Sequence, residues 1–144
     1  MTSNLVIIEQ SFDAPSDKVW KALTDNSQMK EWYFNIDSFR PEVGFKFHFT
    51  AGDDKKKYLH LCEITEVIPG KKISYTWRYD DFEGNSLLSF ELFDEGNHTR
   101  LKLTHSGLET FPNLPVFSPE SFRKGWDYII GISLKEFLEK NDIK

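Results

Sequence analysis

The sequence predicts an α+β fold in which a curved antiparallel sheet of about six or seven strands surrounds one long C-terminal helix. Three observations lead to this prediction. The middle of the chain alternates between apolar and polar residues, with short turn signals between the runs. The last part carries an apolar stripe at helical spacing. Two short helical segments follow the first apolar run.

The first strand and the two short helices are predicted from the opening third of the chain. LVIIEQSF (residues 5–12) has the composition of a strand. APSDKVWKALTD (residues 14–25) is typical of a short helix, because Pro15 suits a helix start and apolar residues recur on one face. NSQMKEWY (residues 26–33) predicts a second short helix, with Ser27 as its cap.

A meander of antiparallel strands is predicted next, because each run has one apolar and one polar face. The gaps between runs are short and contain Gly, Asp, Asn or Pro, as hairpin connections require. The runs are VGFKFHFTAG (43–52), YLHLCEITEVI (58–68), KISYTWRYDD (72–81), NSLLSFELFDEG (85–96) and NHTRLKLTHSG (97–107).

The long helix is predicted to begin after a Pro-rich loop and to cover the apolar face of the sheet. Ser118 can cap it, and Pro119 fits its first turn. Leu138 falls at the margin of the apolar side. Gly125 lies near the edge of the stripe, where a missing Cβ would allow a close approach; Gly131 has no such explanation. The stripe itself comprises Phe122, Trp126, Ile129, Ile130, Ser133, Leu134 and Phe137.

Length, charge and cysteine content narrow the class of protein. The 144 residues predict a single domain, residues 1–144, of soluble globular composition. A net charge of −5 argues against general nucleic-acid binding, which needs a basic surface. The single cysteine, Cys62, suits a reducing cytoplasm and is expected to be a small buried apolar residue. No apolar run is long enough for a membrane span, and residues 1–10 do not form a signal peptide.

Several sequence blocks resemble one known family. They are FDAPSDKVWKALTDNSQMKEWY, VGFKFHF, EVIPGKKISYTW, HTRLKLTHSGL and GWDYIIGISLKEFL, which together span Phe12 to Leu138. They are similar to the motif blocks of the Hsp90 ATPase activator homologue group within the START-like, or SRPBCC, superfamily. The resemblance implies a helix-grip fold, in which the sheet holds the long helix and a space is left between them.

The resemblance implies three functions, which stay open at this point. The first is non-catalytic binding of a small hydrophobic ligand, lipid-like or aromatic, with no cofactor. The second is a chaperone-associated stress-response module, with a chaperone as partner. The eukaryotic co-chaperone has a separate N-terminal domain, whereas only a few residues precede the first strand here, so we expect the ligand function rather than the chaperone function. The third is a cyclase- or hydrolase-like enzyme that uses the cavity.

The candidate ligand site lies where helix and sheet face each other. The aromatic residues there could line a cavity or simply pack as core. His105 could be a polar anchor or acid–base group in the cavity, or a histidine bonded to the adjacent loop or Ser106. Ser133 could bond to the Ile129 carbonyl or point into the cavity. The predicted ligand-binding set is Trp32, Phe47, Phe49, Tyr75, Trp77, Phe90, His105, Trp126, Ile130 and Ser133.

The remaining histidines and the Pro-rich loop give weaker signals. His48, His60 and His98 occupy apparently outward strand positions, and no pair has metal-ligand spacing on one element. We therefore predict no metal site. No catalytic residue is predicted either, because the sequence has no phosphate-binding Gly-rich loop and no nucleophile elbow. The loop of residues 111–117 precedes the long helix and is a candidate gate for the cavity.

Overall fold

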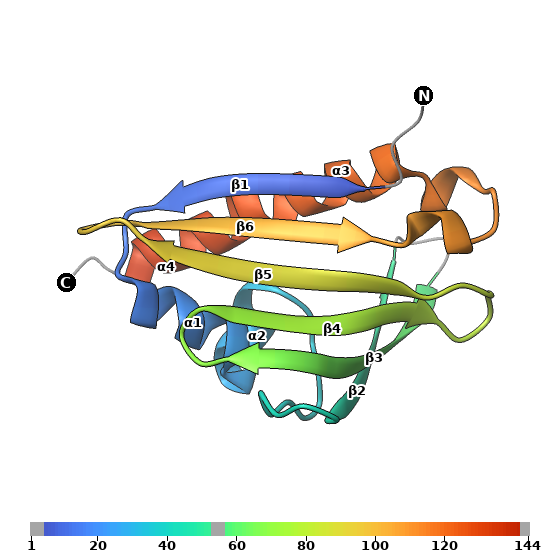
Figure 1. Cartoon of the computed structure of the whole chain (residues 1–144), viewed down its shortest axis with the longest axis horizontal. Helices are drawn as coiled ribbons and strands as arrows, with labels where there is room; N and C mark the ends of the chain where they lie inside the picture. The colour runs from blue at the N-terminus through green and yellow to red at the C-terminus, as the bar shows by residue number, and fades with distance from the viewer. Residues whose placement is uncertain (1–4, 53–56, 142–144) are drawn as a thin grey trace.

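The computed structural model describes residues 5–52 and 57–141 and shows one six-stranded antiparallel sheet with a long C-terminal helix behind it (Figure 1). The predicted α+β helix-grip architecture is therefore confirmed. The elements are β1 (Val6–Phe12), α1 (Ser16–Thr24), α2 (Asn26–Trp32), β2 (Lys46–Gly52), β3 (Lys57–Ile68), β4 (Lys72–Tyr79), β5 (Ser86–Asp94), β6 (Thr99–Ser106), η1 (Leu108–Thr110), η2 (Pro115–Phe117), α3 (Pro119–Tyr128), η3 (Ile129–Leu134) and α4 (Lys135–Asn141).

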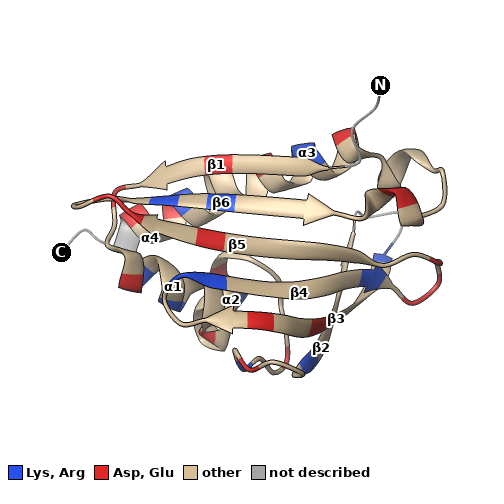
Figure 2. Cartoon of the chain, viewed as in Figure 1, with Lys and Arg blue, Asp and Glu red and all other residues tan. Residues whose placement is uncertain are grey.

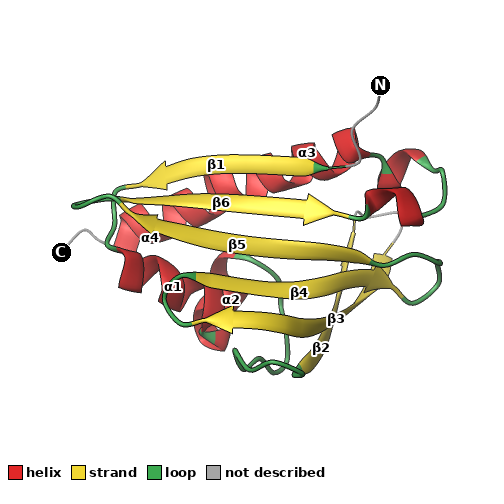
Figure 3. Ribbon diagram, viewed as in Figure 1, coloured by secondary structure: helices red, strands yellow, loops and turns green. Residues whose placement is uncertain are grey.

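The strand order is β1-β6-β5-β4-β3-β2, so the first strand joins the last one and the meander runs outward from there. All helices lie on one side or at one end of the sheet (Figure 3). The opposite face carries Lys, Arg, Asp and Glu interspersed along its strands (Figure 2). This division follows from the alternation in each strand, because apolar positions face the helix and polar positions face outward.

The long helix changes its geometry in the middle. α3 is followed by a π-helical turn, η3, and then by α4. Trp126, Ile130, Leu134 and Leu138 are all buried at a spacing of four residues. In a regular α-helix, side chains four residues apart differ in direction around the helix axis by about 40°. A π turn has more residues per turn, so it reduces this rotation. The turn therefore brings Leu138 fully into the core, not to its margin, while Phe137 is only partly buried.

The two short helices confirm the prediction, but the cap of α2 differs. The Asp25 carboxylate accepts a hydrogen bond from the backbone N–H of Gln28 and occupies the cap position. Ser27, the predicted cap, instead donates its hydroxyl to the same carboxylate at 2.6 Å. Asp is as good a cap as Ser, and it stands one residue before the first helical residue, where a cap must be.

Ser133 ties the long helix to the short ones. Its hydroxyl donates to the backbone carbonyl of Trp32 at 2.6 Å, not to the carbonyl of Ile129 in its own helix. Trp32 is the last residue of α2, so the bond satisfies one of the free carbonyls at that helix end. The Trp32 indole N–H donates in turn to the carbonyl of Ala22 in α1, at 2.8 Å. Both short helices are thereby linked to η3.

The two helix glycines are not sites of close approach. A Cβ added to Gly125 would meet nothing within 4 Å, so the predicted contact with sheet or loop is wrong. A Cβ at Gly131 would only come to 3.9 Å from the Gln10 side-chain oxygen. Gly125 instead borders a pocket, which is described below.

We expect Ser133→Ala to lower the free energy of unfolding by about 1 kcal/mol, because the Trp32 carbonyl loses its hydroxyl partner. Urea denaturation measures this difference. Ser38→Ala is the control, because Ser38 is exposed in the loop that follows α2. Equal effects of the two substitutions would contradict a structural role for the Ser133 bond.

Candidate functional site

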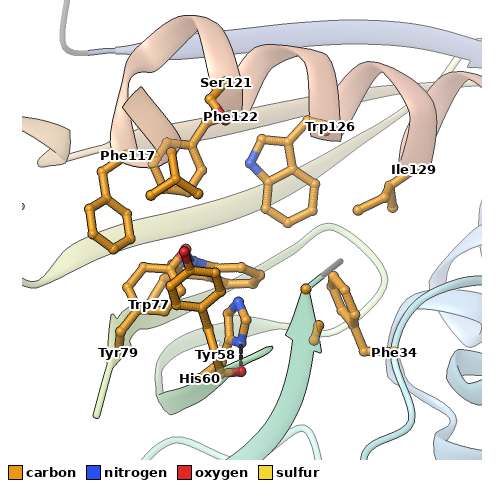
Figure 4. A pocket seen from close by; sticks show the side chains of 14 residues that line it. Phe34, Tyr58, His60, Trp77, Tyr79, Phe117, Ser121, Phe122, Trp126 and Ile129 are labelled. Carbon is orange, nitrogen blue, oxygen red and sulfur yellow. Dashed lines mark hydrogen bonds between the residues drawn. The ribbon is translucent and has the colours of Figure 1, made fainter. Parts of the chain in front are cut away.

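A pocket of about 330 Å³ opens between the first half of the long helix and the ends of three strands. α3 and η2 form one wall, and the ends of β2, β3 and β4 form the other, with Phe34 closing one side (Figure 4). The pocket is bordered mainly by aromatic rings, which favours apolar, flat molecules. These rings belong to Phe34, Tyr58, Trp77, Tyr79, Phe117, Phe122 and Trp126.

The structure brings two of the predicted ligand-binding residues to this pocket, Trp77 and Trp126. The other predicted residues lie elsewhere between helix and sheet or on neighbouring elements. Seven of them are buried in the core, namely Trp32, Phe47, Phe49, Tyr75, Phe90, His105 and Ile130. Ser133 is bonded to the Trp32 carbonyl, so its hydroxyl is already used within the protein.

The second half of the helix packs against a filled part of the sheet. The Phe47 ring meets the Tyr75 ring edge-on, with centroids 4.9 Å apart. The hydroxyls of Tyr33 and Tyr75 are hydrogen-bonded at 2.7 Å, and burial raises the pKa of both groups above the ordinary tyrosine value. These aromatic residues therefore act as core there, whereas the pocket lies at the end near η2.

A buried chain of hydrogen bonds fixes Trp126 against the sheet. The Trp126 indole N–H donates to Nδ1 of His105 at 3.1 Å. Because Nδ1 accepts, the proton of the neutral imidazole is assigned to Nε2. Nε2 lies 2.8 Å from Oγ of Ser86 and donates to it, and that hydroxyl donates to the Trp77 carbonyl at 2.7 Å. The chain joins α3, β6, β5 and β4, and we call it the Trp126–Trp77 relay.

His105 serves this relay and is fully buried. Its partners are Ser86 and Trp126, so the predicted bond to the adjacent loop or to Ser106 is wrong. Burial lowers the pKa of His105 from 6.5 to about 3, which keeps the ring neutral at physiological pH. His105 does not border the pocket itself, but its bond to the indole N–H holds the ring of Trp126 in the pocket wall.

His60 is one of several pocket residues outside the predicted ligand-binding set. It was predicted to face outward, but it is 6% exposed and borders the pocket. Its Nδ1 donates to the Tyr58 carbonyl at 3.0 Å, and its ring stacks on Phe49 with centroids 4.5 Å apart. The sequence did carry a signal, because His60 shares its strand face with Cys62, which was correctly expected to be buried.

Burial lowers the pKa of His60 from 6.5 to about 4, although the backbone of Tyr58 and Phe49 favours the protonated ring. At neutral pH the imidazole is therefore uncharged. Tyr79 contributes another polar group, because its hydroxyl oxygen accepts from the Trp77 indole N–H at 2.9 Å. Over the described part of the chain, the pocket is bordered by no Asp, Glu, Lys or Arg side chain.

The Pro-rich loop forms part of the pocket wall. Phe117 is buried, and its ring lies 5.0 Å from that of Tyr79 and 4.9 Å from that of Phe82. Val116 beside it is 40% exposed and also borders the pocket. A gating role for residues 111–117 stays a prediction.

Within residues 5–52 and 57–141, no three His, Cys, Asp or Glu side chains gather as metal ligands would.

Comparison with known proteins gives a family and a shared fold. The model of the family described as Activator of Hsp90 ATPase homolog 1-like protein matches residues 13–139. Protein MLL2253 from Mesorhizobium loti is 28% identical, with a TM-score of 0.77, over 96% of this chain and 99% of that one. No curated protein sequence matches this chain. None of the helices in the described segments has the length and apolar character needed to cross a membrane.

Two further solved structures share the fold at lower identity. DynU16, a protein in the dynemicin biosynthetic locus, is 22% identical with a TM-score of 0.80. That match covers 96% of this chain but 48% of DynU16, so this chain spans about half its length. The Aha1 dimer from Colwellia psychrerythraea is 24% identical with a TM-score of 0.70, over 94% of this chain and 96% of that one.

The two buried histidines predict a loss of stability in acid. Their pKa values are lowered by folding, so below pH 6.5 the unfolded chain binds protons that the folded chain does not. The free energy of unfolding should therefore fall by about 1.4 kcal/mol per pH unit for each histidine. We expect His105→Gln and His60→Phe each to reduce this slope between about pH 6 and pH 4.5. Urea denaturation at several pH values measures it, and a slope unchanged in both variants would contradict the neutral state of the two rings.

Proposed function

The chain belongs to the Activator of Hsp90 ATPase homolog 1-like family, and from this premise we propose that it binds one small apolar, aromatic-type ligand without transforming it. The ligand would lie in the pocket between α3 and the ends of β2, β3 and β4. Such a role fits a START-like domain, whose sheet and helix can enclose a small molecule. A cytoplasmic location and a single-domain chain belong to the same proposal.

One observation carries the proposal: an aromatic-walled space of about 330 Å³ that no described charged side chain enters. Ligand pockets usually measure about 300–1,000 Å³ and are mostly apolar with a few placed polar groups. This pocket is at the small end of that range, which favours a ligand of two or three rings over a long acyl chain. Binding would be driven by burial of apolar surface against the rings of Trp77 and Trp126.

The same geometry favours binding over catalysis. Acid–base chemistry needs a positioned proton donor and acceptor near the reacting atoms. His60 is the imidazole at the pocket, and the described pocket residues provide neither a carboxylate nor an amine to work with it. His105 is enclosed behind Trp126 and bonded through both ring nitrogens. A hydrolase- or cyclase-like reaction therefore has less support than simple binding.

A chaperone-associated role is the second candidate, and the family match favours it. It would depend on the surface of the domain and not on the pocket. Stimulation of Hsp90 ATP turnover by the purified protein, retained when the pocket is blocked, would place this role ahead of ligand binding.

We expect the neutral apolar probe N-phenyl-1-naphthylamine to bind saturably and to change tryptophan fluorescence, because Trp77 and Trp126 border the pocket. Gly125→Met should weaken this binding by at least about tenfold, since the new side chain extends from a position where an added Cβ meets open space beside the pocket. Fluorescence titration measures both effects.

Lys124→Met is the matched control, because Lys124 is the exposed neighbour on the same helix and does not border the pocket. Its affinity for the probe should match that of the wild type. No saturable binding up to the solubility limit of the probe, or equal binding by Gly125→Met, would overturn the proposal.

A further inference from the structure

His60 presents a ring nitrogen to the pocket. Nδ1 of the imidazole donates to the Tyr58 carbonyl at 3.0 Å, which fixes the ring by one edge. The second nitrogen, Nε2, points away from this carbonyl, toward the space below Trp126 (Figure 4). The ring is held flat against Phe49 with an interplanar angle of 12°, and Trp77 meets it edge-on at 5.0 Å. The direction of Nε2 is therefore set before any ligand arrives.

The hydrogen bond of Nδ1 determines what Nε2 can do. A carbonyl oxygen can only accept, so Nδ1 carries the proton of the neutral ring. Nε2 then carries a lone pair and accepts hydrogen bonds. Burial lowers the pKa of His60 to about 4, so the ring is neutral at pH 7, and the bond to the Tyr58 carbonyl assigns its proton to Nδ1. The pocket thus holds a fixed, uncharged acceptor among aromatic walls.

A buried acceptor discriminates between ligands that are otherwise alike. A ligand that covers Nε2 without offering a proton leaves the nitrogen desolvated and unpaired, which costs affinity. A carboxylate is still less suitable, because its lone pairs and negative charge would face the lone pair of Nε2 and the aromatic walls. An aromatic hydroxyl offers the missing donor and a flat ring together.

We propose that Nε2 of His60 accepts a hydrogen bond from the hydroxyl of an uncharged aromatic ligand, so that the pocket selects a phenol over the same ring system without a donor. This proposal rests on the proposed function and adds to it the chemical class of the ligand and the residue that recognises it. His60 is thereby assigned as a ligand-binding residue, and Trp77 and Trp126 supply the apolar contacts.

Three probes with the same two rings test the selection. They are 2-naphthol, which offers a hydroxyl, 2-methoxynaphthalene, which does not, and 2-naphthoate, which is an anion. At pH 7 the wild type should bind 2-naphthol about tenfold more tightly than 2-methoxynaphthalene, the usual effect of one hydrogen bond, and 2-naphthoate most weakly. Isothermal titration calorimetry measures the three affinities.

The variant His60→Phe should remove the preference and leave 2-methoxynaphthalene binding within about threefold of the wild type, because a phenyl ring can still stack on Phe49. His48→Phe is the matched control: His48 is an exposed histidine on the neighbouring strand β2, and its substitution should preserve the preference.

A second measurement needs no variant. In the wild type, the ¹⁵N resonance of the non-protonated His60 nitrogen should shift when 2-naphthol binds and should not shift in the same way with 2-methoxynaphthalene. Equal affinities for these two probes, with no ¹⁵N shift, would overturn the role of His60 and leave apolar binding in place. Failure of all three probes to bind would overturn the proposed function as well.

Discussion

The position of the long helix on the sheet depends on the Trp126–Trp77 relay. The indole of Trp126, the imidazole of His105 and the hydroxyl of Ser86 are polar groups inside an apolar core, and each finds its partner within the relay. A buried donor or acceptor without a partner costs more than a typical hydrogen bond contributes. The relay therefore favours the observed arrangement of α3, β6, β5 and β4, because a displacement that breaks one of its bonds leaves a buried polar atom unpaired.

The pocket follows from this fixed position. Trp126 turns its N–H toward His105 and presents its ring to the open space, so the relay holds one wall of the pocket in place. Farther along the helix the π turn keeps Ile130, Leu134 and Leu138 on the core side, and aromatic residues of the sheet fill the interface. The interface between helix and sheet is therefore filled around Ile130 and Leu134 and open beside Trp126.

Much of the fold could be predicted from the sequence, because alternation and helical spacing report which face of each element is buried. The strands and the long helix were found this way, and Trp77 and Trp126 were placed between sheet and helix. The partners of His105 could not be predicted, since Ser86 and Trp126 reach it through strand pairing and helix packing that local pattern does not encode. The burial of His60 is different, because the alternation of its strand places it on the same face as the buried Cys62, whereas its polarity favours an outward position. The rings of Phe49 and Tyr79 accommodate the neutral imidazole on the buried face.

The most direct test of the relay is the tautomer of His105, observed by long-range ¹H–¹⁵N correlation of the imidazole ring at neutral pH and again near pH 5. The relay requires a proton on Nε2 and a lone pair on Nδ1. The same neutral pattern should persist near pH 5, because burial keeps the pKa of this ring at about 3. A proton on Nδ1 at neutral pH, or a doubly protonated ring near pH 5, would contradict the account.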